Sequence, residues 1–310
     1  MVSMFVSFLK EIKGPKISEL GGKGYSLVIL MKNEFNVPKG FIIISQAFFK
    51  FLKDNKLKEK IEKLIYEINE SNFQEKSKEI KNLITNGKIP RKIVFEIEAG
   101  LKKLNAKSVS VRSSAVSEDS LKASFAGLHD TFLNVKSDLN NVLENIKRCW
   151  ASLFNERAVI YRIKKGIPHL EGMAVVVQEM IPAEISGVTF TVHPIKARYL
   201  LIEASYGIGD LIVGGRVEPD DYVVDRETLE IVERKIGRKD KMNVIKDEEV
   251  KIVVVERELA EKQALSDEKI KEIALISLKV EKLFNYPQDI EWCIWNNKLW
   301  LLQSRAITGV

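Results

Sequence analysis

The stretch PQDIEWCIWNNKLWLLQSRA, residues 287–306, reads as two short strands joined by a turn. Apolar and polar residues alternate along both runs, which is the pattern of strands that bury one face. Acidic residues recur along the first run, and a glutamine and an arginine follow along the second. A hairpin does not need such a polar row for its own stability, so the row indicates a function that the rest of the chain has to explain.

The pairing register of this hairpin decides which side chains share a face. A two-residue turn at Asn296 and Asn297 would place Glu291 opposite Leu302 and would mix polar and apolar residues on both faces. A three-residue loop at 296–298 gathers the polar row on one face instead. The pairs are then Trp295 with Leu299, Glu291 with Gln303 and Asp289 with Arg305. Because a slip of one residue inverts every side chain, we predict the three-residue loop.

The composition is that of a globular protein. The chain has 310 residues, of which 45% are hydrophobic, enough to bury a large core. This length predicts one bilobed unit or two to three packed subdomains. The two cysteines, Cys149 and Cys293, form no CxxC pair, which argues against a disulfide framework or a cysteine-based zinc site. They favour two ordinary core residues in a reducing compartment, so we expect a cytoplasmic protein.

The charge pattern argues against several classes of partner. Lysine is interleaved with glutamate at helical spacing across residues 50–107, as on exposed helix faces. Without interleaved aromatic residues this segment does not indicate nucleic-acid binding, and the net charge of +6 suits a polyanion such as a nucleotide. The opening MVSMFVSFLKEIK lacks the features of a signal peptide. No run approaches the ~18 apolar residues of a membrane span, so we expect no membrane partner.

Amphipathic periodicity predicts three helices. The first runs from Ser45 to about Glu70, the second from Asp138 to Lys165 with Gly166 ending it, and the third from a Ser266 cap to about Phe284. The side chains expected to face inward are Phe48, Phe49, Leu52, Ile61, Leu64, Ile65 and Ile68 in the first helix, and Leu139, Val142, Ile146, Trp150 and Leu153 in the second.

Strands are predicted mainly in the second half of the chain. Their ranges are 108–112, 173–180, 186–192, 199–205, 220–226, 229–236 and the closing hairpin. Helices and strands are mixed in the first half, whereas strands dominate from about residue 173. The pattern predicts a two-lobed α+β chain, with an N-terminal lobe at about 1–181 and a C-terminal lobe at about 182–310.

Two further stretches are candidates for phosphate binding. LGGKGYSL, residues 20–27, places three glycines around Lys23, and such glycines let a backbone approach a phosphate closely. SVSVRSSAVSEDSLKASFAGLHDTFLNV, residues 108–135, follows a strand with Arg112, two serines and a run of small and hydroxylated residues. Such a flap can close over a triphosphate. Taken alone, the first stretch could be a plain loop and the second a disordered surface loop.

Together these motifs resemble the N-terminal nucleotide-binding domain shared by phosphoenolpyruvate synthase, pyruvate phosphate dikinase, the plant glucan water dikinases and rifampicin phosphotransferase. The resemblance runs from about Lys10 to Thr308 and implies an ATP-grasp-type fold. Its motifs are GGKGYSL, VPKGFIIISQAFFKFL, VSVRSSAVSEDSLKASFAGLHDTFLNV, SGVTFTVHP, IEASYGIGDLIVGGRVEPDDYVVD and YPQDIEW with LLQSRAIT.

The resemblance implies roles for individual residues in binding ATP. Lys23 and Arg112 are expected to contact the phosphates, which suits phosphoryl transfer because it depends mainly on positioning and charge neutralisation. Gly127 and Thr131 match the phosphate-covering loop. The segment that lines the adenine pocket is matched by Gln178, Glu179 and Met180.

The closing hairpin is expected to bind Mg²⁺ and phosphate. The resemblance implies that Glu291, Gln303 and Asp289 bind the metal and that Arg305 contacts phosphate, and oxygen ligands are those that Mg²⁺ prefers. Lys23, Arg112 and Arg305 are therefore the expected catalytic residues. The alternative for the hairpin is a surface ladder of cross-strand pairs, worth tenths of a kcal/mol each.

The chain departs from the family pattern at four positions. His193 stands where Asp or Asn is usual, Asp210 replaces a Glu, Gly215 lies in a region that often reads VSG, and Ala306 replaces a proline. None of these removes an expected phosphate or metal ligand. They bear on lobe closure and substrate preference.

Family dikinases pass the phosphoryl group to a histidine in a GGxTSHAA-like motif, and this motif is absent from these 310 residues. The three histidines, His129, His169 and His193, lie in other contexts. We therefore predict a phosphoenolpyruvate synthase type phosphotransferase module whose partner is a separate protein carrying the histidine and pyruvate-binding domains. The alternatives are a module of pyruvate phosphate dikinase or of a dikinase for another acceptor (rifampicin, glucan), and a non-catalytic nucleotide-binding module.

Overall fold

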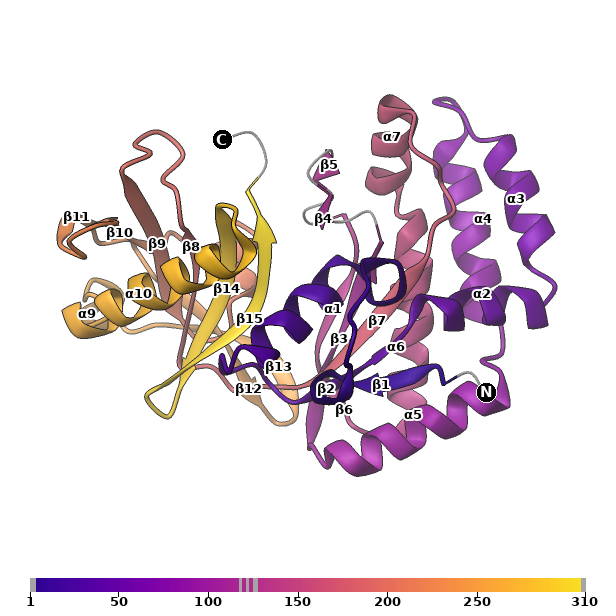
Figure 1. Cartoon of the computed structure of the whole chain (residues 1–310), viewed down its shortest axis with the longest axis horizontal. Coiled ribbons are helices and arrows are strands. Elements are labelled where there is room, and N and C mark those ends of the chain that lie inside the picture. Colours follow the sequence, from indigo (N-terminus) through magenta and orange to yellow (C-terminus); the bar gives the residue numbers. More distant parts are fainter. Residues whose placement is uncertain (1–3, 117–118, 121–122, 125–127, 308–310) are drawn as a thin grey trace. The chain divides into compact units, whose positions relative to one another are not determined.

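The computed structural model describes residues 4–116, 119–120, 123–124 and 128–307 (Figure 1). The chain forms two compact units. The first contains Met1–Ile29 and Lys39–Met180, and the second contains Leu30–Pro38 and Ile181–Val310. Both units combine helices with antiparallel sheets, so the predicted α+β class is confirmed.

A five-stranded antiparallel sheet organises the first unit. Its order is β1-β2-β7-β3-β6. The bounds are Val6–Phe8 (β1), Gly40–Ile43 (β2), Met173–Glu179 (β7), Ser108–Ala115 (β3) and Thr131–Lys136 (β6). Two short strands, β4 (Asp119–Ser120) and β5 (Ala123–Ser124), pair with each other after β3.

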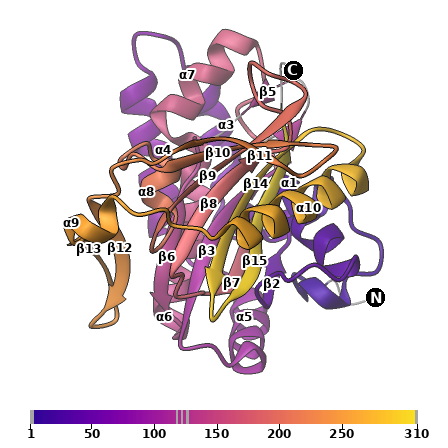
Figure 2. The ribbon, with the colours of Figure 1, turned by 90° about the vertical axis from the view of Figure 1, so that its left-hand side faces the viewer.

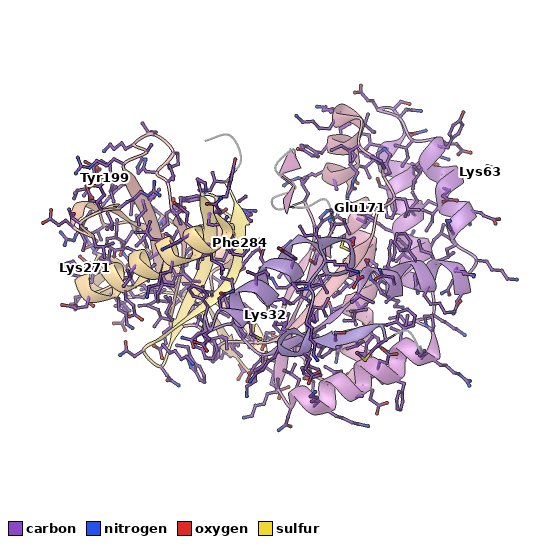
Figure 3. All side chains as sticks on the ribbon, in the orientation of Figure 1. Lys32, Lys63, Glu171, Tyr199, Lys271 and Phe284 are labelled. Atoms are coloured by element: carbon purple, nitrogen blue, oxygen red, sulfur yellow. The ribbon has the colours of Figure 1, made fainter. Side chains whose placement is uncertain are left out.

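The helices of the first unit surround this sheet. They are η1 (Leu9–Glu11), α1 (Ile17–Lys32, which ends in the second unit), α2 (Ser45–Asp54), α3 (Lys58–Tyr66), α4 (Phe73–Asn86), α5 (Arg91–Leu104), α6 (Leu139–Ala151), η2 (Ser152–Phe154) and α7 (Glu156–Lys165). Lysines such as Lys63 on α3 point outwards from them (Figure 3), so the exposed-face interpretation of residues 50–107 is confirmed there.

Two of the predicted helices are interrupted, and an asparagine side chain holds each interruption. The prediction of a single helix at 45–70 is wrong, because α2 ends before Asn55. The Asn55 Nδ2 donates to the carbonyls of Phe51 and Lys88. The helix expected at 138–165 is broken by η2 and by Asn155. The Asn155 amide donates to Asp130 Oδ1 at 2.8 Å.

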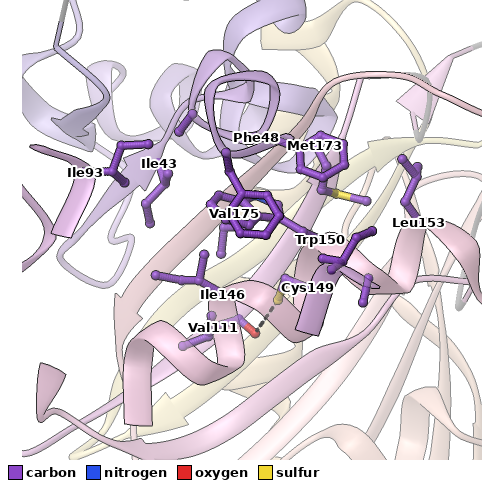
Figure 4. Packing of buried hydrophobic residues seen from close by; sticks show 14 of the residues in the cluster. Ile43, Phe48, Ile93, Val111, Ile146, Cys149, Trp150, Leu153, Met173 and Val175 are labelled. Carbon is purple, nitrogen blue, oxygen red and sulfur yellow. Dashed lines mark hydrogen bonds between the residues drawn. The ribbon is translucent and has the colours of Figure 1, made fainter. Parts of the chain in front are cut away.

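An aromatic cluster forms part of the core of the first unit (Figure 4). The Trp150 ring lies 5.0 Å from that of Phe51 and 5.7 Å from that of Phe48, and all three side chains are fully buried. The prediction that Phe49 faces inward is wrong, because its side chain is 42% exposed. Cys149 lies within this core, and both cysteines are free and buried as predicted.

A six-stranded antiparallel sheet organises the second unit. Its order is β11-β10-β9-β8-β14-β15 (Figure 2). The bounds are Ile231–Lys235 (β11), Asp220–Asp225 (β10), Tyr199–Tyr206 (β9), Ile185–Phe190 (β8), Gln288–Trp295 (β14) and Lys298–Ala306 (β15). The remaining elements are α8 (Asp210–Val213), α9 (Arg257–Ala260), α10 (Asp267–Phe284) and the hairpin of β12 (Lys241–Lys246) and β13 (Glu249–Val254).

One face of the six-stranded sheet is covered by α10. This helix begins at a Ser266 cap, as predicted, and the Ser266 hydroxyl accepts from the Lys269 N–H. Arg234 on β11 donates to Asp267 on α10 at 2.7 Å, which identifies the covered face. Cross-strand pairing places Tyr222 and Ile202 on that face. The opposite face carries the polar row of the hairpin.

Candidate nucleotide-binding site

In the first unit, the glycine motif packs directly against the VRSS motif. Helix α1 contains a break at Gly21, whose φ is 67° and ψ 174°. A Cβ atom at this position would lie 2.0 Å from the Ser114 carbonyl oxygen, so only glycine fits. The Ser114 hydroxyl donates to the Leu20 carbonyl at 2.8 Å and accepts from the Gly24 N–H at 3.0 Å.

This contact brings the two predicted phosphate ligands into the same region of the first unit. Lys23 lies between Gly21 and Gly24, and Arg112 precedes Ser114 by two positions on the same face of β3. Lys23 is 7% exposed and Arg112 is 8% exposed. Two cations from different segments of the chain suit an anion such as a phosphate, because hydrogen bonds from charged donors are the strong ones.

Thr131 and Gln178 lie on strands that pair with β3. Thr131 pairs with Arg112, which places its side chain on the same face as the guanidinium. Gly127, the other residue expected in the phosphate-covering loop, lies outside the described residues. Gln178 pairs with Ser110 and is 2% exposed.

The predicted adenine segment ends the first unit. The Glu179 N–H donates to the Lys39 carbonyl at 2.8 Å, and the Met180 N–H donates to the Ser108 carbonyl at 3.1 Å. Both donors are therefore engaged within the sheet region. Recognition of a base by Gln178, Glu179 and Met180 would have to use their carbonyl oxygens and side chains.

In the second unit, the hairpin turn differs from the prediction. Trp295 pairs with Lys298, so the turn has two residues, and Asn296 and Asn297 adopt φ values of 49° and 58°. This is the geometry of a type I′ turn, which matches the twist of the strands and which asparagine tolerates. The predicted three-residue loop, with Trp295 opposite Leu299, is wrong.

A β-bulge nevertheless gives the predicted polar pairing. The register shifts between Glu291 and Trp292, because Trp292 pairs with Leu301 while Glu291 pairs with Gln303. Leu302 is thus the extra residue on β15. Beyond the bulge, Asp289 pairs with Arg305 as predicted.

Asp289 and Arg305 form a partly buried ion pair on this face. Arg305 Nε donates to Asp289 Oδ2 at 2.7 Å. Asp289 is 6% exposed, and its Oδ1 atom has no hydrogen-bond partner in the described part of the chain. Burial raises the pKa of Asp289, the Arg305 guanidinium lowers it, and the Glu291 carboxylate raises it further.

The donor set of the hairpin fits Mg²⁺. Glu291 is half-buried, Gln303 is 3% exposed, and both lie on the strand face that carries Asp289, whose Oδ1 atom has no partner in the described part of the chain. Within the described ranges, no three His, Cys, Asp or Glu side chains gather into a group that could hold a metal ion alone. An Mg²⁺ ion here would therefore need oxygens of a nucleotide to complete its coordination, as Mg²⁺ commonly does.

Two acidic residues on the same face escaped the sequence analysis. Glu291 pairs with Val188, Val188 with Glu203, and Glu203 with Asp221, so the polar row continues across the sheet. The available signal was a carboxylate at an alternating position inside the apolar run YLLIEAS, residues 199–205.

A glycine break beside buried cations, and a row of oxygen donors with an unpartnered carboxylate, are features of proteins that bind nucleotides together with a metal ion. The chain belongs to the family described as "Pyruvate phosphate dikinase, AMP/ATP-binding domain", whose model matches residues 17–310. The ATP-grasp-type assignment rests on this membership.

Curated relatives resemble the whole chain. The "Probable phosphoenolpyruvate synthase" of Methanocaldococcus jannaschii is 39% identical over 98% of this chain and 27% of its own length. The protein of the same name from Archaeoglobus fulgidus is 39% identical over 99% of this chain and 42% of its own length. The "Phosphoenolpyruvate synthase" of Pyrococcus furiosus is 33% identical over 99% and 44%, respectively. The chain thus spans less than half the length of these relatives.

A solved structure, D-alanyl-alanine synthetase A from Vibrio cholerae, covers 70% of this chain with 12% identity and a TM-score of 0.30, too low to define a fold. Among helices in the described ranges, none combines the length and apolarity needed to cross a bilayer.

Proposed function

We propose that this chain is the ATP- and Mg²⁺-dependent phosphotransferase module of a phosphoenolpyruvate synthase type enzyme. The observation that carries the proposal is the polar face of the closing hairpin. There a buried carboxylate oxygen without a partner, Asp289 Oδ1, lies on the same face as the neighbouring pair of Glu291 and the buried Gln303. A cross-strand ladder made only for stability would leave no such orphaned oxygen, since burying one costs about 1–3 kcal/mol.

The residues divide the work of phosphoryl transfer. Glu291, Gln303 and Asp289 would hold Mg²⁺, which supplies charge neutralisation at the phosphates when bound. Arg305, Lys23 and Arg112 would contact the phosphates, with Gly127 and Thr131 in the loop that covers them. Gln178, Glu179 and Met180 would recognise adenine. Because transfer depends on position and charge, loss of any one cation should lower the rate of phosphoryl transfer strongly and the free energy of unfolding only slightly.

The acceptor proposed is a histidine outside these 310 residues. His129 and His193 have structural roles in this chain. His129 Nδ1 lies 3.1 Å from the Ser152 carbonyl oxygen, and His193 Nδ1 accepts from two backbone N–H groups. Burial lowers the pKa of His169, and the Arg162 charge lowers it further. We propose that the acceptor histidine lies on a separate protein that also binds pyruvate.

The test is label transfer from ATP. The chain is incubated with Mg²⁺, ATP labelled at the β or γ position, and candidate histidine-domain proteins. We expect acid-labile label on a histidine of one of them, lost in Glu291→Gln and retained in Glu230→Gln, whose exposed side chain lies off the hairpin. Tight MgATP binding without transfer to any histidine would favour the non-catalytic module instead. Labelling of a histidine within the same polypeptide would contradict the separate carrier.

A further inference from the structure

Glu203 and Asp221 form a pair of carboxylates directly opposite each other on β9 and β10. Both lie on the face that carries Glu291 and Gln303, and both are half-buried. Within the described part of the chain, neither side chain has a hydrogen-bond or ion-pair partner. The nearest cation along the row is Lys235, which pairs with Asp221 across the strands, but its ammonium binds Glu218 at 3.1 Å.

This pair is unfavourable for the fold itself. Like charges directly opposite in a sheet repel each other. Burial raises the pKa of Glu203, and the charges of Asp221 and Asp289 raise it further. Burial is also the main cause that raises the pKa of Asp221, while Lys235 opposes it. Since stability does not explain the pair, a role toward a ligand does.

Contacts on the α10 side of the sheet hold β10 in position. Asp220, next to Asp221, is fully buried and points to the α10 side of the sheet. Its Oδ1 accepts from the Gly237 N–H at 3.0 Å and from the fully buried Lys239 ammonium. Its Oδ2 accepts from the Tyr222 hydroxyl at 2.9 Å and from the Ala264 N–H at 2.8 Å. The Asp221 carboxylate is therefore presented on a rigid strand.

The distance from the expected metal ligands suits a reacting phosphoryl group. Glu203 lies two strands from Glu291, or roughly 9.5 Å at the usual strand spacing. Two metal–oxygen bonds of about 2 Å each and a near-attack distance of about 3 Å, with a phosphoryl group between them, span a similar length. Asp289, whose buried Oδ1 has no partner, is close enough to act on the Glu203 charge.

An apolar cluster borders this region and lowers its polarity. Val188, between Glu291 and Glu203 in the row, packs with Leu211, Ile212 and Val217. Charges beside such a cluster are screened less than charges in water, so two carboxylates here act strongly on an incoming anion.

We propose that Glu203 and Asp221 select water over inorganic phosphate as the second phosphoryl acceptor. This inference rests on the proposed function. The pair repels an anionic acceptor and leaves room for a neutral one. In the step, the water oxygen forms a bond to the γ-phosphorus of ATP. At the same time the bond from that phosphorus to the oxygen bridging the β and γ positions breaks. The bridging oxygen keeps the electron pair, inorganic phosphate is released, and Glu203 accepts the proton of the water.

The test uses the full chain saturated with Mg²⁺ and an ATP analogue that cannot be hydrolysed between its β and γ positions. Inorganic phosphate is titrated into this complex by calorimetry. We expect phosphate to bind only weakly to the wild type and to Glu230→Gln, and to bind at least about tenfold more tightly to the double variant Glu203→Gln/Asp221→Asn, because two charges within several ångströms are removed. If the double variant does not unfold cooperatively, the two single variants replace it.

A second measurement follows phosphate release from MgATP. We expect release to fall about 10²-fold in Glu203→Gln, the usual effect of removing a general base. Release at the wild-type rate would overturn the proton-accepting role. Phosphate binding no tighter in the double variant than in the wild type would overturn the selection of water while leaving the proposed function intact. Failure of the wild type to bind the MgATP analogue would overturn both, so the two failures are distinguishable.

Discussion

One ring nitrogen of His193 holds the turn that follows β8. His193 Nδ1 accepts from the Ile195 N–H at 3.1 Å and from the Lys196 N–H at 3.2 Å. An Asp or Asn oxygen, the usual residue in the family pattern, can accept the same two bonds. The departure at this position therefore keeps the function of the usual side chain.

We expect His193→Asn to leave the free energy of unfolding nearly unchanged and His193→Ala to lower it by about 1 kcal/mol, because two backbone donors lose their acceptor. Urea unfolding at pH 7.5 measures both values. Equal stability of the Asn and Ala variants would show that the ring does not hold the turn.

Glu203 gives a pH-dependent prediction. Its pKa is raised in the folded chain by burial and by Asp221 and Asp289, so folding disfavours its charged form. The penalty is absent below the unfolded pKa, grows as the pH rises from the unfolded to the folded pKa, and is fully present above the folded pKa. We expect Glu203→Gln to be more stable than wild type at pH 7 by about 0.5–1 kcal/mol, the usual cost of like charges across a strand pair.

This difference should vanish near pH 4, where the wild-type carboxyl is protonated. Thermal unfolding at both pH values measures it, with Glu230→Gln as the exposed control. A Glu203→Gln variant that is less stable than wild type at pH 7 would mean that the carboxylate has a stabilising partner.

At the residue level, the sequence could predict which side chains share the hairpin face, because alternation along a strand is strict. It could not reveal Glu203 and Asp221 as neighbours, because their pairing depends on the order of β9 and β10 in the sheet. Nor could it show that Asp289 Oδ1 lacks a partner while Oδ2 binds Arg305, which depends on side-chain geometry.

The bulge at Leu302 decides what the closing hairpin presents. Deleting Leu302 would remove the bulge and leave a regular hairpin, in which Glu291 still pairs with Gln303 and Asp289 with Arg305 on the same face of the sheet. We therefore expect the deletion to keep MgATP affinity within about twofold of wild type, because the same side chains still face the nucleotide. Calorimetric titration with MgATP measures this affinity.

The matched control changes the turn and leaves the bulge in place. Asn297→Gly should keep MgATP affinity and should keep or raise the melting temperature, because Asn-Gly is a favoured type I′ sequence. Loss of MgATP binding on deletion of Leu302 would show that the bulge itself, and not only the pairing of the row, is needed for nucleotide binding.

The break in α1 gives a prediction with a control in the same segment. Gly21→Ala puts a methyl group against the Ser114 carbonyl at a residue with φ of 67°, so we expect a loss of about 1–3 kcal/mol. Gly14→Ala should have little effect, since a Cβ there meets nothing within 4 Å and φ is not positive. Guanidinium unfolding compares the two. A Gly21→Ala variant as stable as Gly14→Ala would contradict the close approach of the two motifs.

Elements with strong periodicity were predicted well, and their interruptions were not. Strands β7 to β10 lie within a few residues of the predicted ranges. The interruptions after α2 and after η2 have no local signal, because the side chains of Asn55 and Asn155 bind partners distant in the sequence, at Lys88 and Asp130. The prediction of a three-residue loop is wrong because it requires a regular hairpin, whereas a bulge on β15 gives the same polar pairing with a two-residue turn.

The division of the molecule into units has a feature that no local pattern indicates. Leu30–Pro38 belongs to the second unit, although it lies between segments of the first. The Leu301 N–H on β15 donates to the Asn36 carbonyl at 2.8 Å, and Val37 is 6% exposed. The contact joins residues far apart in the sequence, so only the folded chain reveals it.

This arrangement predicts how the chain behaves when it is cut. A protease site inserted after the exposed Pro182 would separate residues 1–182 from 183–310. Because residues 30–38 supply a backbone bond and buried side chains to the second unit, we expect the two fragments to elute together in gel filtration without denaturant. Val37→Ala removes two buried methyl groups, worth about 1.6 kcal/mol at 0.8 each, and should weaken fragment association by about tenfold. The exposed Asn33→Ala is the control, and native fragments that separate on cutting would show that 30–38 does not anchor the second unit.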